Sequence, residues 1–319
     1  MKREYYNFEN IRLLPKKCIV ESRKDCDASV QLGKFKFKLP IVPANMTTVI
    51  SETMALFLAK NNYFYIMHRF EFDNVAFVAK MKAQNLYSSI SLGIKLEDYN
   101  VIDELKAKNL IPDFITIDIA HGHSQYMEKI LKYIKIHLPQ TFVIAGNIAT
   151  AEAAQDLVSW GADCVKVGIG PGKVCTTKLK TGFGTAGWQP KACLDIFNTI
   201  KQPIILDGGL REHGDIAKAI RFGATICMVG AILAGLEESP GKTVQVDGQF
   251  LKEYYGSASA FNKKNNDNIE GKRIFVPIEG NIASKLREVN QDLQSAISYS
   301  GGNKLFDLRI VDYVLLVSE

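Results

Sequence analysis

Four short apolar segments in the middle of the chain decide its fold: FITIDIA at residues 114–120, TFVIAGN at 141–147, CVKVGIG at 164–170 and PIILDGG at 203–209. Each is almost continuously apolar, as expected for a strand buried on both faces of a parallel sheet. Each ends in glycine or small and polar residues, where a strand gives way to a loop. They recur every ~25 residues or more, with amphipathic stretches of helical period between them.

The same pattern extends to both sides of these segments. PIVPANM at 40–46, YFYIMHR at 63–69, SSISLGI at 88–94 and TICMVGA at 225–231 bring the number of strand candidates to eight. Eight strand–helix units in an unbroken series predict an α/β fold, a closed (β/α)8 TIM barrel formed by a single domain over residues 1–319. An open doubly wound sheet is the alternative, although it seldom has eight regular repeats.

Helix signals support this interpretation. Ser51 stands where the cap of the first helix is needed, and Gly161 and Gly223 follow two others at left-handed C-cap positions. The expected helices span residues 51–61, 74–85, 124–137, 151–161 and 213–223.

Two segments interrupt the rhythm: the glycine-rich stretch 170–188 after the sixth strand and the polar stretch 237–280 after the eighth. Loops of this length are usually functional lids or disordered, and both would lie at the catalytic face of a barrel. We expect a mobile flap at about 237–280. We expect the N-terminal ~35 residues and residues 304–319 to pack as additional strands or arms.

Composition excludes several classes of protein. With 47% hydrophobic and 23% charged residues the chain is not disordered. A net charge of +5, spread along the sequence, is too weak to indicate nucleic-acid binding. No apolar run reaches the ~18 residues of a membrane span, and the N-terminus is not a secretory signal. The six cysteines are scattered without CxxC pairs, which predicts free thiols in a reducing cytoplasm.

The stretch GIGPGKVCTT at 168–177 is the most informative for chemistry, because it places Cys175 in a glycine-rich loop directly after a buried strand. Backbone N–H groups and Lys173 would favour the thiolate of an exposed nucleophile. A glycine-rich turn with an incidental cysteine is an equally open interpretation. At the next two strand ends, DGG at 207–209 and MVGAILAG at 228–235 favour a phosphate site, with Asp207 on ribose hydroxyls. Tight turns with a capping aspartate are the alternative.

Other polar residues are ambiguous from the sequence alone. His121 and His123 are two apart and do not share a helix face, so a structural role is favoured over metal binding. Arg69 and Asp118 each end a strand, where they are either ligand contacts or ordinary rim and capping residues. Glu270 lies in a polar segment and carries little signal by itself. No GxGxxG fingerprint supports a Rossmann site.

Taken together, the motifs PANM, IDIAHGHS, VIAGN, KVGIGPGKVCTT, ILDGG, YYGSAS and IEGK, in this order, resemble the IMP dehydrogenase/GMP reductase family. The resemblance covers essentially the whole chain, and GPGKVCTT with DGG downstream is highly specific. Dehydrogenases of the family usually carry CBS modules after the second barrel strand, and this chain has no room for them. That, with the continuation TGFGTAGWQ, favours the reductase branch.

The resemblance implies NADPH-dependent, irreversible reductive deamination of GMP to IMP and ammonia in purine salvage, by a cytoplasmic homotetramer without nucleic-acid or membrane partners. Cys175 would form a covalent thioimidate, and Thr177 and Glu270 match the proton-transfer pair. Positions matching substrate contacts are Asp207, Gly208, Gly209, Gly230, Ala231, Gly256, Ser257, Ala258 and Gly271. Positions matching cofactor contacts are Ser22, Arg23, Arg69, Asp118, Ile119, Ala120, Ile169 and Gly170. Carbonyls that hold a monovalent cation such as K+ in related enzymes match Gly170, Gly172 and Cys175.

Two departures from the family pattern concern these contacts: NDN stands before Ile269-Glu270, and Ala231 replaces a familiar glycine. Three other functions remain as alternatives. One is an IMP dehydrogenase without CBS modules, which would oxidise IMP with NAD. The second is a flavin-dependent barrel oxidoreductase, and the third is a nucleotide-binding barrel without turnover.

Overall fold

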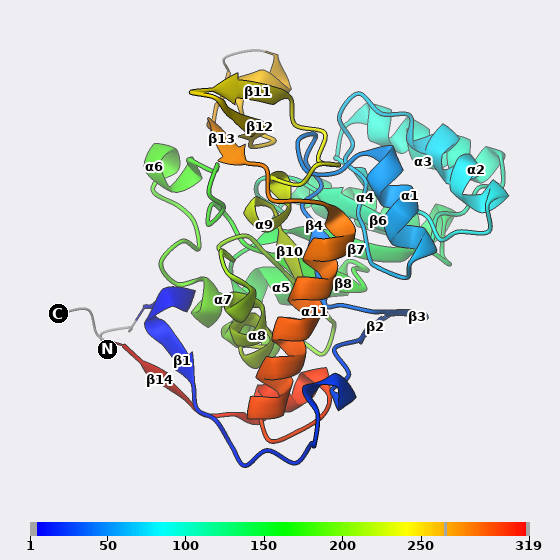
Figure 1. Ribbon diagram of the computed structural model, residues 1–319. Helices are drawn as coiled ribbons and strands as arrows, with labels where there is room; N and C mark the ends of the chain where they lie inside the picture. The colour runs from blue at the N-terminus through cyan, green and yellow to red at the C-terminus, as the bar shows by residue number, and fades with distance from the viewer. Residues whose placement is uncertain (1–4, 265–266, 317–319) are drawn as a thin grey trace.

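The computed structural model describes residues 5–264 and 267–316, and within them a curled parallel sheet surrounded by helices forms a TIM-barrel-like α/β fold (Figure 1). In this described part, seven strands pair in the order β4-β10-β9-β8-β7-β6-β5. The strands are β4 (Ile41–Pro43), β5 (Ser89–Leu92), β6 (Phe114–Asp118), β7 (Phe142–Ile148), β8 (Cys164–Val167), β9 (Ile204–Asp207) and β10 (Ile226–Val229). The predicted α/β barrel architecture is therefore confirmed.

The second predicted strand, residues 63–69, differs from the expectation because it forms no regular strand. The segment is nevertheless buried beside β5, and the Met67 N–H donates to the Ser89 carbonyl at 3.2 Å. Side-chain hydroxyls bind backbone groups that the ladder between two strands would otherwise pair. Tyr87 donates to the Tyr63 carbonyl, and the Tyr65 hydroxyl accepts from the Ser89 N–H. Such competing side-chain bonds are not visible in an apolar pattern.

The five helices predicted from the sequence are present and start and end close to the predicted positions. Ser51 Oγ accepts from the Met54 N–H at 3.2 Å, and Gly161 and Gly223 have φ values of 110° and 105°. The helices are α1 (Glu52–Lys60), α2 (Asn74–Ala83), α3 (Leu96–Ala107), α4 (Gln125–His137), α5 (Ala151–Ser159), α6 (Thr177–Thr181), α7 (Gln189–Phe197), α8 (His213–Arg221), α9 (Ala231–Ala234), α10 (Ala260–Lys263) and α11 (Ile282–Tyr299). No described helix is long and apolar enough to span a membrane.

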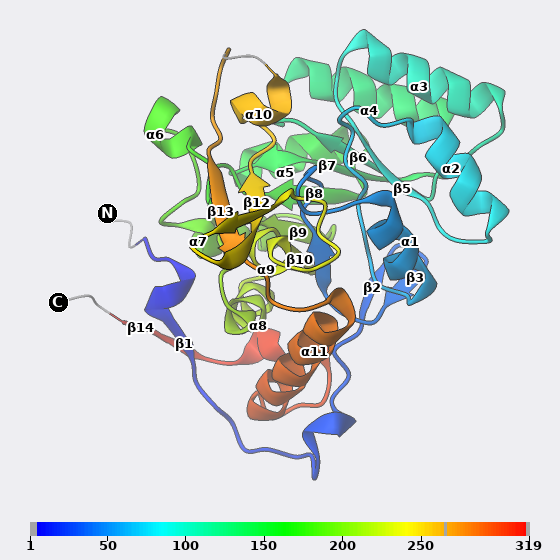
Figure 2. The same ribbon diagram turned by 45° about the horizontal axis from the view of Figure 1, so that its top comes forward.

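The segment 237–280, which we call the flap, contains a three-stranded antiparallel sheet where the sequence analysis expected a loop. Its strands are β11 (Thr243–Val246), β12 (Gln249–Tyr255) and β13 (Arg273–Pro277). Asp247 and Gly248 form the two-residue turn between the first two strands, both with positive φ, as a tight hairpin requires. In Figures 1 and 2 this sheet lies at one end of the barrel, beside α6 and α9.

The chain termini and an N-terminal hairpin cover other parts of the barrel. Strands β1 (Ile11–Leu13) and β14 (Tyr313–Leu315) pair antiparallel far from the flap (Figure 1), which confirms the predicted terminal arms. Strands β2 (Val30–Leu32) and β3 (Phe35–Phe37) form a hairpin. The ring of Phe37 packs against that of Phe64, with 4.9 Å between the ring centroids. The remaining described elements are the 3-10 helices η1 (Phe8–Asn10), η2 (Arg23–Asp25) and η3 (Leu305–Ile310).

Candidate active site

The flap docks on the cysteine loop at the carboxyl end of β8. Cys175 pairs with Gly271 in an isolated antiparallel bridge, and the Thr176 N–H donates to the Glu270 carbonyl at 2.8 Å. Gly271 also bridges Ser259 within the flap. These backbone bonds bring together two segments almost a hundred residues apart in sequence. The docking places the Glu270 side chain beside the cysteine.

Three predicted catalytic side chains form one hydrogen-bonded series. Cys175 Sγ lies 3.1 Å from Thr177 Oγ1, and the Thr177 hydroxyl donates to Glu270 Oε2 at 2.6 Å. A hydroxyl that donates its proton to a carboxylate retains lone pairs, so it can accept the thiol proton. The sulfur also lies 3.6 Å from the Glu270 carbonyl oxygen. The arrangement connects a potential nucleophile to a proton acceptor through one hydroxyl.

Two glycine-rich turns flank this series. Gly208 and Gly209 follow β9 with φ values of 83° and 78°, and a Cβ on Gly208 would lie 3.1 Å from Pro171 Cγ. A side chain there would therefore be both strained and crowded. After β10, Gly230 precedes the short helix α9, and a Cβ on it would lie 2.4 Å from the Tyr254 hydroxyl. Glycine at both positions is thus required by the packing of the protein itself, and the phosphate site at the ends of β9 and β10 stays a prediction.

Beneath the turns, charged side chains meet in the barrel interior. Lys166, which is 1% exposed, places Nζ 2.8 Å from both Asp118 Oδ1 and Asp207 Oδ2. Burial opposes ionisation, but the two carboxylates outweigh it and raise the pKa of Lys166. Burial would likewise raise the pKa of Asp118, yet Lys166 and Arg69 hold it below its ordinary value. Lys166 and Asp118 each therefore stabilise the charged form of the other.

Two asparagines complete this group. Asn45 Nδ2 donates to Asp118 Oδ2 at 2.9 Å, and Asn147 Nδ2 donates to Asp207 Oδ2 at 2.7 Å. We call the set Asn45, Asp118, Asn147, Lys166 and Asp207 the polar floor. Lys166 and both asparagines were not among the site residues predicted from the sequence. A lysine inside the apolar run CVKVGIG, and asparagines ending PAN and AGN, are the signals that could have identified them.

The predicted cofactor positions separate into two groups. Arg69, Asp118, Ile119 and Ala120 lie near the ends of the second and fourth strand segments, while Ile169 and Gly170 follow β8. Ser22 and Arg23 lie instead on the N-terminal arm, where Arg23 donates to the Tyr299 hydroxyl at 3.0 Å. The structure does not bring these two arm residues to the cysteine of the same chain.

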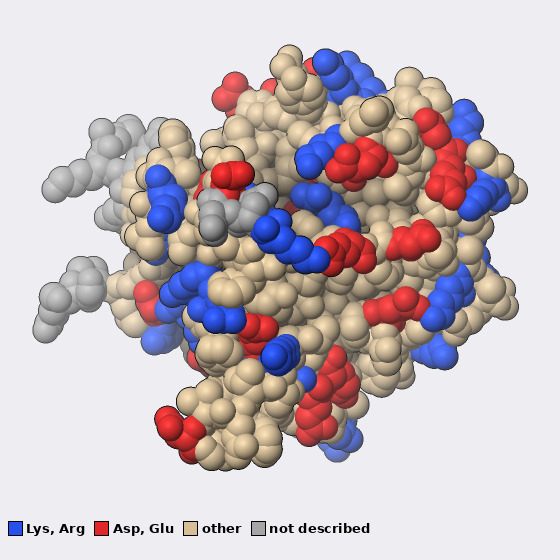
Figure 3. Space-filling view, turned by 90° about the horizontal axis from the view of Figure 1, so that it is seen from above, with Lys and Arg blue, Asp and Glu red and all other residues tan. Residues whose placement is uncertain are grey.

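The remaining substrate and cation positions lie in the loops above the floor. Gly256, Ser257 and Ala258 connect β12 to α10 in the flap, close to Gly271. The Gly172 carbonyl accepts from the Cys175 N–H at 3.0 Å, which closes the turn that carries the cysteine. Seen from above in Figure 3, Lys, Arg, Asp and Glu side chains gather around the centre of this face.

His123 has the structural role that the sequence favoured. Its Nε2 lies 2.8 Å from Asp156 Oδ2 on α5, and its ring lies 5.9 Å from that of Trp160. Among the described residues, one group has suitably spaced metal-ligating atoms: His213, Glu288 and Asp292, within 4.8 Å of one another. Lys285 Nζ already lies 2.9 Å from Glu288 Oε2, and both carboxylates are more than half exposed. This arrangement favours a surface ion-pair cluster.

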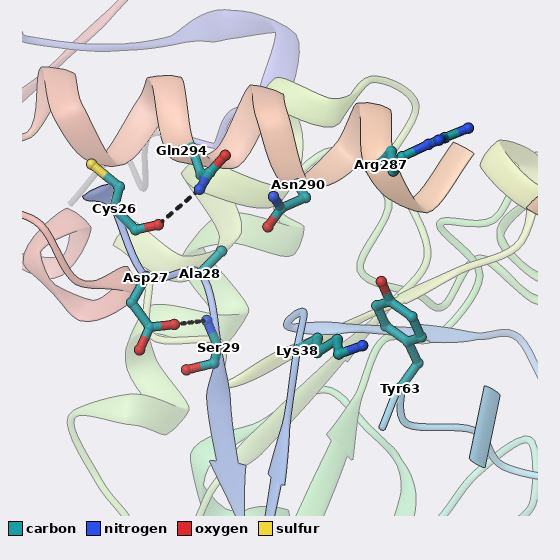
Figure 4. Close-up of a pocket in the computed structure, with 9 residues that line it drawn as sticks. All are labelled: Cys26, Asp27, Ala28, Ser29, Lys38, Tyr63, Arg287, Asn290 and Gln294. Atoms are coloured by element: carbon teal, nitrogen blue, oxygen red, sulfur yellow. Dashed lines mark hydrogen bonds between the residues drawn. The ribbon is translucent and has the colours of Figure 1, made fainter. Parts of the chain in front are cut away.

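A hollow of about 290 Å³ lies elsewhere, between the N-terminal arm, Lys38, Tyr63 and α11 (Figure 4). The Gln294 side chain crosses one edge and donates to the Cys26 carbonyl at 3.1 Å. The hollow contains none of the predicted catalytic, substrate or cofactor residues. It is therefore separate from the candidate active site.

Comparison with known proteins identifies the family of the chain. A family model described as the IMP dehydrogenase / GMP reductase domain matches residues 5–318. The chain belongs to this family. A GMP reductase of Albidiferax ferrireducens is 59% identical over 313 residues, covering 98% of this chain and 96% of the relative. A GMP reductase of Bacillus cereus is 54% identical over 312 residues, covering 98% and 95%.

Proposed function

We propose that this family member is a GMP reductase, which uses NADPH to convert GMP to IMP and ammonia. The observation that carries the proposal is the continuous contact from Cys175 through Thr177 to Glu270. Near-full-length similarity to proteins named GMP reductase supports the same activity. A cysteine, a hydroxyl and a carboxylate in contact suit covalent substitution at an electrophilic purine carbon.

The proposed reaction begins at the cysteine. The thiol proton moves to Glu270 through the Thr177 hydroxyl, and the thiolate attacks C2 of the guanine ring. Glu270 then returns this proton through Thr177 to the departing amino group. The C2–N bond breaks, ammonia leaves, and a thioimidate joins C2 to Sγ. One positioned carboxylate thus serves as base and then as acid.

The second half exchanges sulfur for hydrogen. NADPH, when bound, supplies the hydride for C2. The carbon–sulfur bond then breaks, its electron pair returns to Cys175, and IMP is released. The overall balance is GMP, NADPH and two protons giving IMP, NADP+ and ammonium. The flap excludes water from the covalent stage, because hydrolysis there would divert the reaction.

The nucleotide is held by the strand-end turns and the flap. Asp207 uses Oδ2 for its bonds to Lys166 and Asn147, which leaves Oδ1 for a ribose hydroxyl. The turns after β9 and β10, at Gly208-Gly209 and Gly230-Ala231, bind the phosphate through backbone N–H groups. The flap residues Gly256, Ser257, Ala258 and Gly271 cover the purine.

The residues beside Asp118 fit a dinucleotide. Arg69 Nε, His68 Nδ1 and Asn147 Oδ1 are buried without a hydrogen-bond partner in the described part of the chain. Buried polar atoms without partners are costly, so a polar ligand in this region supplies what they lack. Together with Asp118, Ile119, Ala120, Ile169 and Gly170, they hold the nicotinamide end of NADPH.

Assembly and a cation complete the proposal. Ser22 and Arg23 lie on the arm and reach the cofactor of a neighbouring subunit in a homotetramer. The carbonyls of Gly170, Gly172 and Cys175 bind a monovalent cation such as K+, because oxygen donors suit hard cations. The enzyme acts in the cytoplasm, in purine nucleotide salvage.

Two matched assays test the activity. Purified protein with GMP and NADPH should lose NADPH absorbance and release one ammonia for each NADPH oxidised. The same protein with IMP and NAD should show no turnover. Turnover of IMP with NAD, and none of GMP, would assign the dehydrogenase reaction instead.

A further inference from the structure

The position of Lys166 depends on a gap in the neighbouring strand. In the sheet, Asp118 of β6 is in register with Gly146 of β7, which is in register with Lys166 of β8. A Cβ on Gly146 would lie 2.6 Å from Lys166 Cβ, closer than real Cβ contacts. The absence of a side chain at Gly146 therefore lets the Lys166 side chain cross β7 and reach Asp118. It contacts Asp207 of β9 on its other side.

In this arrangement one buried cation, the ammonium group of Lys166, contacts two carboxylates that are expected to bind different ligands. Asp118 lies at the predicted cofactor site, and Asp207 at the predicted ribose site. Lys166 Nζ lies 2.8 Å from an oxygen of each carboxylate, so its positive charge offsets the repulsion between them. Both oxygens of Asp118 accept hydrogen bonds, from Lys166 and Asn45, whereas Asp207 Oδ1 has no hydrogen bond to any described residue.

We propose that Lys166 is a positioning residue that holds the nucleotide site and the dinucleotide site in their binding geometry together. The inference rests on the proposed function and deepens it. Lys166 is almost completely buried beneath Asp118 and Asp207 and acts through them. Replacing it therefore weakens the binding of two chemically different ligands at once, whereas replacing a residue that contacts one ligand weakens the binding of that ligand alone.

The test measures binding without turnover, using calorimetry with GMP alone and with NADP+ alone. Lys166→Met removes the charge with little change in length. We expect each ligand to bind about 10- to 100-fold more weakly, the effect of losing a charge-assisted hydrogen bond. Lys132→Met is the matched control, because this lysine is exposed on α4 and pairs only with Glu128 among the described residues. It should leave both affinities unchanged.

A second variant separates electrostatics from general damage. Lys166→Met leaves two facing carboxylates, with Arg69 near Asp118 and the Tyr254 hydroxyl near Asp207 as the other groups that act on them. Adding Asp118→Asn removes the repulsion. The double variant should therefore unfold at a higher temperature than Lys166→Met and recover GMP affinity, while NADP+ binding stays weak.

The pH dependence provides a third readout. In Lys166→Met the pKa of Asp118 should rise because its main cationic neighbour is lost, so Asp118 is neutralised as pH falls and GMP affinity relative to the parent should rise from about pH 8 to 5.5. The double variant should show no such trend. If the parent binds neither ligand, the proposed function fails. If the parent binds both and Lys166→Met binds them equally well, or the double variant is no better than the single one, the positioning role is wrong.

Discussion

Glu270→Gln is the substitution that most sharply separates proton transfer from binding. Glutamine keeps the shape of the side chain and can still hydrogen-bond Thr177, but it cannot take up a proton. The parent contact between Thr177 Oγ1 and Glu270 Oε2 is 2.6 Å, which is suitable for proton transfer. General acid–base groups contribute about 100- to 10,000-fold to rate, so kcat should fall by that factor. This corresponds to about 3 to 5 kcal/mol in the activation barrier.

Affinity for GMP should change little, because the flap is held by backbone bonds that the substitution leaves in place. The Glu270 carbonyl still accepts from the Thr176 N–H at 2.8 Å. Rapid-quench measurement of ammonia release, with GMP binding measured by calorimetry, distinguishes the two effects. Thr177→Val should cause a similar loss, and the double variant little more, since the two side chains form one path. A collapse of GMP affinity with normal turnover would refute the relay.

Two further substitutions test the packing and electrostatics around the site. Gly208→Ala should lower the free energy of unfolding by about 1 to 2 kcal/mol, because φ at this position is 83°, and it should also weaken GMP binding. Gly214→Ala is the control, because a Cβ at Gly214 would have open space around it, and it should not destabilise the protein. Urea unfolding of both variants checks this. Burial lowers the pKa of His68 from 6.5 to about 4, so as pH falls the unfolded chain binds this proton at a higher pH than the folded protein does. The free energy of unfolding should therefore fall by about 1 to 2 kcal/mol as pH drops from 6.5 to 4, a loss that His68→Gln should remove; equal pH slopes in the two proteins would contradict the shift.

Much of the barrel could be predicted because its strands are buried on both faces and its helices carry local caps. Ser51 and Gly161 signal their structural roles through chemistry that depends on their own turn of the chain. The second strand segment could not be predicted in detail, because hydroxyls of Tyr65 and Tyr87 satisfy backbone groups that a strand would pair. The sheet in the flap was missed although Asp247-Gly248 is a recognisable hairpin turn, because its strands mix polar with apolar residues and lack the continuous apolar runs of the barrel strands.

In the functional site, too, some features could be predicted from the sequence and others could not. Cys175 lies in the loop after the apolar strand β8, and Asp207 ends the apolar strand β9, so their place at the barrel mouth could be predicted from the sequence. The contact of Glu270 with Thr177 depends on how the flap docks, and only the family resemblance pointed to it. Lys166 was missed because its side chain acts across two neighbouring strands, through the gap at Gly146. Interactions perpendicular to the chain leave no periodic signal.

Peptide mass spectrometry of acid-quenched enzyme, taken during turnover of GMP with NADPH, distinguishes covalent catalysis by Cys175 from turnover without an adduct. We predict a purine nucleotide attached to the peptide that contains Cys175, and neither adduct nor NADPH oxidation in Cys175→Ala. Turnover by Cys175→Ala at the parent rate, or a parent enzyme that turns over with no adduct on this cysteine at any quench time, would contradict it.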